Sequence, residues 1–182
     1  MDTKFYTGTG DDGKSNLPGG KEVSKDSTYT SFIGSLDEIN SWLGVCRAET
    51  NISFVSQSIK DIQEALFLAQ AQVAAKVMGR DTDKKITYDK VEMLEKIIED
   101  VDKNAPVIRH FIIPGSNKES AKLDMARSLA RRTEREAVSA KDDLNLPEEL
   151  LSFLNRLSST LFALARFISH RKGIEEESPS YK

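Results

Sequence analysis

Apolar residues recur every three or four positions in five long segments of this chain, a spacing that places them on one face of a helix. One segment starts at Ser27, and the others cover about 53–78, 88–103, 117–141 and 147–171. Alternation typical of a strand never exceeds a few residues. Because short loops join the five segments, the sequence predicts an all-α protein, a five-helix antiparallel bundle that follows a glycine-rich N-terminal loop.

The chain of 182 residues suits a single domain, which we expect to span 1–182. The predicted glycine-rich loop covers 1–26 and the helical bundle covers 27–172. Pro147 lies at a plausible first-turn position of the last helix, and Gly173 is expected to stop that helix. The remaining tail, 173–182, is polar, and we expect it to be loose.

Composition excludes several classes of protein. A net charge of −3 gives no global reason to expect nucleic acid. No apolar run approaches the roughly 20 residues of a membrane span, and the N-terminus resembles no targeting segment, so we expect a cytoplasmic protein without a membrane partner. A single cysteine, Cys46, permits no internal disulfide and is expected to be buried. The two histidines have no metal-ligand partner at useful spacing.

The stretch GTGDDGKS, residues 8–15, matches the spelling of a P-loop, which lies between a strand and a helix. Ser15 is followed by NLPGGK, which cannot open a helix, so a true P-loop fold is not expected. Its glycines expose backbone N–H groups and Lys14 adds positive charge, a combination that can cradle phosphate. Asp11 and Asp12 could hold Mg²⁺ against phosphate oxygens. An ordinary surface turn remains the alternative.

The fourth predicted helix contains ARSLARRTERE. Helical geometry places Arg127, Arg131 and Glu134 on one narrow line, the arginine stripe, with Arg135 at its edge. Arg132 points elsewhere and is expected to be structural or at a subunit contact. Neighbouring guanidinium groups repel one another, so the stripe needs carboxylates from another helix or a polyphosphate ligand. A solvated basic face paired with nearby glutamates is the alternative.

Polar residues also border the apolar faces of two other helices. In the fifth helix, Asn155 and Arg166 lie on the same edge. Asn155 either orients a ligand or satisfies a backbone group within the bundle. In the first helix, Asp37 lies next to Glu38, and one of the two is expected to pair with an arginine of the fourth helix, within a subunit or across an interface.

Four separated stretches together resemble the PduO-type ATP:cob(I)alamin adenosyltransferases. They are YTGTGDDGKSNLPGGKEVSKD, LDEINSWLG, FIIPG, and ARSLARRTERE with FLNRLSSTLFALAR. The resemblance implies a homotrimer of five-helix bundles with active sites between subunits. It also implies that the N-terminal loop is a nucleotide-binding loop that folds over ATP.

The resemblance assigns roles to individual residues. The implied ATP contacts are Thr7, Gly8, Thr9, Gly10, Ser15, Asn16, Lys25, Arg131, Glu134, Arg135 and Asn155. An inter-subunit ion pair falls on Asp37 and Arg127, and a cobalamin-side aromatic falls on Phe111. Arg131, Arg127, Asp37 and Phe111 are therefore the expected catalytic set. The family usually has a basic residue where this chain has Gly8, so a side-chain contact is not expected there, and Lys14 could supply the charge.

The implied reaction is attack of cob(I)alamin on the 5′ carbon of ATP, which gives adenosylcobalamin and releases triphosphate. Mg²⁺ would arrive on the ATP phosphates, with no confident metal ligand from the protein. A flavin-type reductase and an adenosylcobalamin-dependent enzyme are the implied partners.

Three alternatives compete with this reading. They are a non-enzymatic ATP-binding helical bundle, a P-loop kinase or ATPase, and a ferritin-like carboxylate-metal bundle. The last fails because it needs Glu-x-x-His pairs, whereas Val107 and Phe167 stand three positions before the two histidines.

Overall fold

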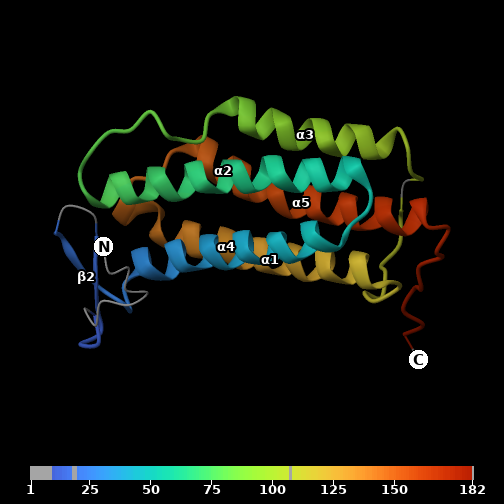
Figure 1. The fold of residues 1–182 in the computed structure, drawn as a ribbon, viewed down its shortest axis with the longest axis horizontal. Helices are drawn as coiled ribbons and strands as arrows, with labels where there is room; N and C mark the ends of the chain where they lie inside the picture. The colour runs from blue at the N-terminus through green and yellow to red at the C-terminus, as the bar shows by residue number, and fades with distance from the viewer. Residues whose placement is uncertain (1–9, 18–19, 107, 182) are drawn as a thin grey trace, which may run out of the picture.

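In the part of the chain that the structure describes, five antiparallel helices form a bundle (Figure 1), and the predicted bundle is confirmed. The computed structural model describes residues 10–17, 20–106 and 108–181. The helices are α1 (Thr28–Glu49), α2 (Ser53–Val77), α3 (Tyr88–Asp102), α4 (Lys118–Leu144) and α5 (Glu148–Arg171). In Figure 1, α1, α3 and α5 run one way along the bundle, and α2 and α4 run the opposite way.

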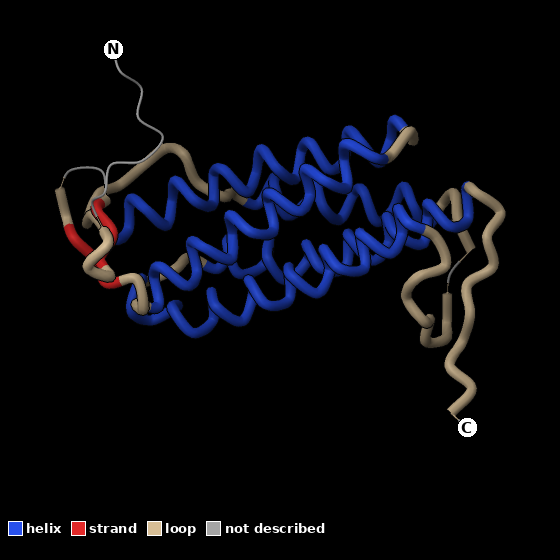
Figure 2. The backbone as a smooth tube through the Cα atoms, turned by 60° about the horizontal axis from the view of Figure 1, so that its bottom comes forward, coloured by secondary structure: helices blue, strands red, loops and turns tan. Residues whose placement is uncertain are grey.

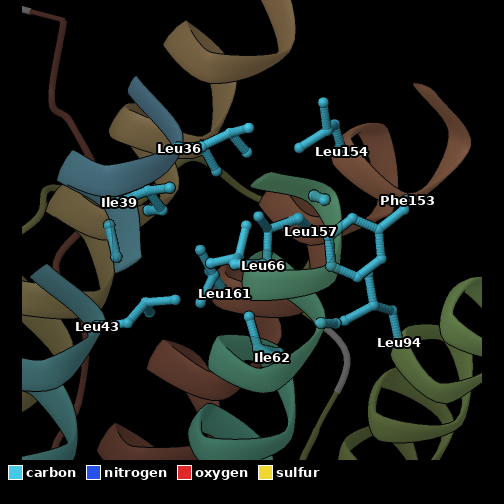
Figure 3. Packing of buried hydrophobic residues seen from close by; sticks show 14 of the residues in the cluster. Leu36, Ile39, Leu43, Ile62, Leu66, Leu94, Phe153, Leu154, Leu157 and Leu161 are labelled. Atoms are coloured by element: carbon cyan, nitrogen blue, oxygen red, sulfur yellow. The ribbon is translucent and has the colours of Figure 1, made fainter. Parts of the chain in front are cut away.

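The apolar faces of the helices meet in one core. Helix α4 packs between α1 and α5, while α2 packs on α1 and α3 packs on α5. Figure 3 shows leucine, isoleucine and phenylalanine side chains from α1, α2, α3 and α5 interdigitating there. Burial of this apolar surface is the main stabilising term of the fold. The core makes α4 and α5 a rigid base for the polar residues at their border.

Helix boundaries follow local capping chemistry. The Ser27 and Asn117 side chains accept hydrogen bonds from backbone N–H groups of the first turns of α1 and α4. Asn145 ends α4 with φ +47°, and Gly173 follows α5 with φ +63°, both in the left-handed region. Pro147 precedes α5 as its N-cap, one position before the first turn predicted for it. The predicted stop at Gly173 is confirmed.

The glycine-rich segment contains a short hairpin that the sequence did not predict. Strands β1 (Lys14–Asn16) and β2 (Glu22–Ser24) pair antiparallel at the end of the bundle where α1 and α5 begin (Figures 1 and 2). A P-loop would have a helix after Ser15, but that residue lies within β1. The sheet of the described residues has only these two strands. The P-loop alternative is therefore wrong, because the described strands form no parallel sheet.

The C-terminal tail docks at the opposite end of the bundle, beside the loop that joins α3 to α4 (Figure 1). The side chain of Glu176, in the tail, is buried and forms an ion pair with Arg166 of α5. The Ile113 N–H of the loop donates a hydrogen bond to the Glu177 carbonyl at 2.8 Å. The expectation of a loose tail is therefore wrong for this stretch, because a buried carboxylate and a backbone bond hold it.

Two side chains of α1, Cys46 and Trp42, lie against neighbouring parts of the bundle. Cys46 is buried, as predicted. Burial raises the pKa of its thiol to about 11, and the nearby Lys122 ammonium opposes this only in part. The Trp42 indole N–H donates to the Lys122 carbonyl of α4 at 2.9 Å, so this half-buried ring ties two helices together. In the described part of the chain, no helix is long and apolar enough to cross a membrane.

Candidate functional site

Arg131 lies between two cavities on the α4 side of the bundle. The α4–α5 cavity, of about 550 Å³, is lined by Arg131, Glu134, Arg135, Val138, Ser139 and Asn155. The loop cavity, of about 410 Å³, lies beside α3 and the α3–α4 loop and is also lined by Arg131. One exposed guanidinium group can therefore reach ligands in both spaces.

The α4–α5 cavity is held in shape by a chain of side-chain hydrogen bonds. The Asn155 amide donates to Glu134 Oε1 at 2.8 Å, which joins two of the predicted ATP contacts. Arg156 donates to Asn155 Oδ1 at 3.0 Å and to Glu95 Oε1 of α3 at 2.8 Å. Because both ends of the Asn155 amide are engaged, its orientation is set by its neighbours. The predicted alternative, a backbone partner for this side chain, is not observed among the described residues.

The loop cavity combines cationic and apolar walls. Arg127, Arg131 and Arg166 line it together with Ser158, Phe162 and the half-buried Ile108. The Arg166 guanidinium lies over the Phe162 ring at 4.9 Å from its centroid, a cation–π contact. Arg166 also donates to Asp124 Oδ2 at 2.6 Å, and both side chains are buried. Such walls suit a large, partly apolar ligand that carries polar groups at its rim.

Asp37 and Arg127, the predicted inter-subunit pair, do not meet within this chain. Asp37 is exposed, and it forms no ion pair in the described part of the structure. The buried Nε of Arg127 also lacks a hydrogen-bond partner among the described residues. The neighbouring Glu38 instead pairs with Arg132 of α4 within the chain. This confirms the expectation that one of Asp37 and Glu38 pairs with an arginine of the fourth helix, here within the chain.

The N-terminal hairpin holds the described part of the predicted nucleotide loop. The Lys25 ammonium donates to the Gly10 carbonyl at 2.6 Å and so closes the loop. Gly10 has φ +97°, and a Cβ there would lie 2.6 Å from the Lys14 carbonyl oxygen, so only glycine fits. Lys14 pairs with Glu22, while Ser15 and Asn16 lie on β1. Thr7, Gly8 and Thr9 lie outside the described residues.

Within one chain, this hairpin and the arginine stripe occupy separate places. The described hydrogen bonds between the hairpin and the bundle involve α1 and α2: the Thr30 hydroxyl donates to the Ser24 carbonyl at 3.0 Å, and Lys21 Nζ donates to the Val77 carbonyl at 2.6 Å. No described hydrogen bond or ion pair joins Gly10, Ser15, Asn16 or Lys25 to Arg131. The structure of one chain therefore brings together the helical half of the predicted site, but not its N-terminal half.

Phe111 lies on the α3–α4 loop with 78% of its surface exposed. It therefore does not anchor the core, and it is not among the residues that line the loop cavity. Sequence reasoning missed Asp124, which pairs with the buried Arg166. The two residues are 42 positions apart, so no local spacing signals their pairing.

The described residues contain no group of three or more His, Cys, Asp or Glu that could hold a metal ion. Asp12 instead accepts a hydrogen bond from the Lys14 N–H at 3.1 Å, within its own turn.

Comparison of the sequence with known proteins identifies the family to which the chain belongs. The model of the cobalamin adenosyltransferase family matches residues 5–168. This chain belongs to that family. A corrinoid adenosyltransferase from Citrobacter freundii is 36% identical over 177 residues, covering 97% of each chain. One from Bacillus subtilis is 35% identical over 175 residues, covering 94% of this chain and 89% of the relative.

A solved structure of a family member shows the same fold. It is a variant of the PduO-type ATP:corrinoid adenosyltransferase from Lactobacillus reuteri, complexed with cobalamin and ATP. The two share 28% sequence identity with a TM-score of 0.88, and the match covers 97% of this chain and 99% of the other. The family resemblance seen in the sequence is thus confirmed.

Proposed function

We propose that this cobalamin adenosyltransferase family member transfers the 5′-deoxyadenosyl group of ATP to cob(I)alamin. The nucleophilic cobalt attacks the 5′ carbon, a cobalt–carbon bond forms, and the carbon–oxygen bond breaks. The electron pair of that bond leaves on triphosphate. The step needs no general base, but it needs in-line placement and stabilisation of the charge gained by the leaving group.

The position of Arg131 is the observation that carries this proposal. Its guanidinium lines both the α4–α5 cavity and the loop cavity. We assign the α4–α5 cavity to the nucleotide and the loop cavity to the corrinoid, so Arg131 would lie where the two substrates meet. A planar guanidinium grips phosphate oxygens bidentately and stabilises the triphosphate as it leaves.

The remaining nucleotide contacts come from two parts of the chain. The hydrogen-bonded pair of Glu134 and Asn155 would orient the nucleotide, with Arg135 beside it. The glycine loop with Lys25, Ser15 and Asn16 would cover the phosphates from the N-terminal side, together with Thr7, Gly8 and Thr9. Mg²⁺ would be carried by the phosphate oxygens of ATP.

We further propose a homotrimer whose active sites form between subunits. The exposed Asp37 and the unpartnered, buried Nε of Arg127 are complementary groups that do not meet within one chain. A second chain that brings its Asp37 to Arg127 would satisfy both. It would also bring its N-terminal hairpin to the arginine stripe, from which the hairpin is separate in one chain. Sedimentation of the wild type and of Asp37→Asn tests this, and a monomeric, active wild type would contradict it.

Phe111 is the proposed aromatic of the corrinoid side. Reduction of cob(II)alamin becomes easier when cobalt loses its lower axial ligand, and an apolar ring in that space favours the four-coordinate state. The exposed side chain on the loop is free to take this position. A Phe111→Ala protein should lose activity with cob(II)alamin and a reductase, and full activity would overturn this role. A flavin-type reductase as electron donor, an adenosylcobalamin-dependent enzyme as acceptor of the product, and a cytoplasmic location remain predictions.

The deciding experiment is the absorbance change from cob(I)alamin to adenosylcobalamin after addition of Mg-ATP, with triphosphate measured in parallel. Arg131→Ala should slow it by about 10²–10³-fold, as loss of a charge-stabilising donor does in other enzymes. ATP binding without adenosylcobalamin or triphosphate would favour the alternative of a non-enzymatic ATP-binding bundle.

A further inference from the structure

Arg166 lines the loop cavity, and its guanidinium contacts two carboxylates, those of Asp124 and Glu176. Its Nη2 donates to Asp124 Oδ2 at 2.6 Å, and its Nε lies 3.3 Å from Glu176 Oε1. The side chains of Arg166 and Glu176 are each 7% exposed, and that of Asp124 is 6% exposed. The contact to Glu176 is an ion pair without hydrogen-bond alignment. Asp124 belongs to α4, whereas Glu176 belongs to the tail, so the arginine links the bundle to the tail.

A second set of bonds fixes Glu176. The Ser169 hydroxyl of α5 donates to Glu176 Oε1 at 2.8 Å and accepts from Asn117 Nδ2 at 3.1 Å. Asn117 is also the N-cap of α4, so the tail carboxylate is joined to the start of one helix and the end of another. The flanking Glu175 and Glu177 are exposed. Only the middle residue of three consecutive glutamates takes part in the buried network.

The tail in turn holds the loop that carries Phe111. The Ile113 N–H donates to the Glu177 carbonyl at 2.8 Å, one residue from Glu176 and two residues from Phe111. Ile108, His110 and Glu176 line a cavity of about 300 Å³ between the loop and the tail. Arg166 and Ile108 line both this cavity and the loop cavity. Loop, tail and Arg166 therefore form one connected unit beside the proposed corrinoid site.

We propose that Glu176 is a positioning residue that, through Arg166 and the tail backbone, holds the Phe111 loop against the corrinoid side of the site. This inference rests on the proposed function for its catalytic consequence, but its structural part stands alone. The tail has no helix or strand among its described residues, so its place depends on a few specific contacts. Of the charged residues described in the tail, Glu176 alone has a buried side chain, and a buried carboxylate that loses its partner is costly.

The first arm of the test measures the loop without substrates. Glu176→Gln keeps the shape of the side chain but removes its charge, and Glu177→Gln is the matched control at an exposed neighbour. Hydrogen exchange should become about tenfold faster at the Ile113 amide in Glu176→Gln, equivalent to about 1.4 kcal/mol. Amides in the middle of α4 should not change in either variant. Unchanged exchange at Ile113 would overturn the proposal.

The second arm measures catalysis with both corrinoid oxidation states. Glu176→Gln should raise the KM for the corrinoid about tenfold, equivalent to about 1.4 kcal/mol, and leave the KM for ATP unchanged. The loss of rate should be greater with cob(II)alamin and a reductase than with pre-reduced cob(I)alamin, because Phe111 is proposed to act in the reduction. An equal rise in both KM values would indicate a general structural defect and contradict a positioning role.

A second variant guards against a failure to fold. Ile113→Pro removes the N–H donor of the loop and leaves the buried ion pair intact. It should reproduce the corrinoid effect with normal helix content by circular dichroism, and an unchanged corrinoid KM would overturn the link between tail and loop. A wild-type protein that makes no adenosylcobalamin would refute the proposed function, while the exchange measurement would still decide whether Glu176 holds the loop.

Discussion

The α4–α5 cavity and the loop cavity share Arg131 but are built in different ways. The first is lined by residues of two regular helices, and the exposed Asn155 and the half-buried Glu134 shape it through a hydrogen bond. The second combines α3, α4, α5 and an irregular loop, and its guanidinium wall is held by the buried pair of Arg166 and Asp124. Surface hydrogen bonds thus shape one cavity and a buried ion pair supports the other.

This difference bears on how each cavity responds to change. An exposed hydrogen bond contributes little to folding, because water replaces the lost partner. A buried ion pair that loses one member leaves an uncompensated charge in a medium of low polarity. Substitutions in the α4–α5 cavity should therefore alter ligand binding, whereas substitutions behind the loop cavity should alter stability as well.

The largest effect should follow loss of the buried pair. Asp124→Ala leaves Arg166 without its only aligned hydrogen-bond acceptor among the described residues, and should reduce the free energy of unfolding by about 3–5 kcal/mol. For a chain of this length the melting temperature should fall by roughly 6–20 °C. Thermal denaturation measures this directly. A change below 1 kcal/mol would remove the proposed contrast between the two cavities.

A smaller effect, on binding rather than folding, is expected for Asn155→Ala. The variant removes the amide that is proposed to orient the nucleotide together with Glu134. Loss of one hydrogen bond to a charged ligand should weaken ATP binding by about 1.5–3 kcal/mol, or roughly 10- to 150-fold. Isothermal titration with ATP gives the dissociation constant, and the melting temperature should hardly change. Asn104→Ala is the control, because that amide donates to the Asp100 carbonyl at the end of α3. Equal ATP affinity of the wild type and Asn155→Ala would contradict the assignment of the nucleotide cavity.

Gly10→Ala tests whether the N-terminal loop belongs to the nucleotide side. The added Cβ would lie 2.6 Å from the Lys14 carbonyl oxygen at a left-handed backbone position. The loop must shift at a cost of about 1 kcal/mol or more, which should raise the KM for ATP roughly fivefold. Gly79→Ala is matched to it, because Gly79 has φ +64° but open space around it. The control should keep the wild-type KM, and the same rise in both variants would argue against a specific role for the loop.

The smallest effect is expected for Glu38→Ala, which breaks the exposed pair with Arg132. Pairs of this kind contribute about 0.2–1 kcal/mol, so the melting temperature should fall by no more than about 4 °C. Both Glu38→Ala and Asp124→Ala remove a carboxylate that pairs with an arginine, but the first pair is at the surface and the second is buried. Similar losses in the two variants would show that burial does not set the difference.

Sequence patterns predicted most of the fold, because the relevant interactions are local. The apolar spacing located all five helices, and the confirmed stop at Gly173 followed from local backbone preferences. The hairpin was missed because its strands have only three residues each, too short for an alternating pattern. The arginine stripe was visible for the same reason as the helices, and the α4–α5 cavity indeed contains Arg131 and Glu134.

The sequence by itself therefore determined the helices, their ends and the set of charged residues at the core border, since each depends on neighbours a few positions apart. Only the tertiary structure decided which charges meet. Arg166 pairs with Asp124 and Glu176, and Arg132 pairs with Glu38, across separations in the chain that no local pattern relates. The sequence alone does not distinguish the three consecutive glutamates of the tail, Glu175, Glu176 and Glu177. Packing of the tail against α5 buries one of them, because only its side chain faces the buried guanidinium.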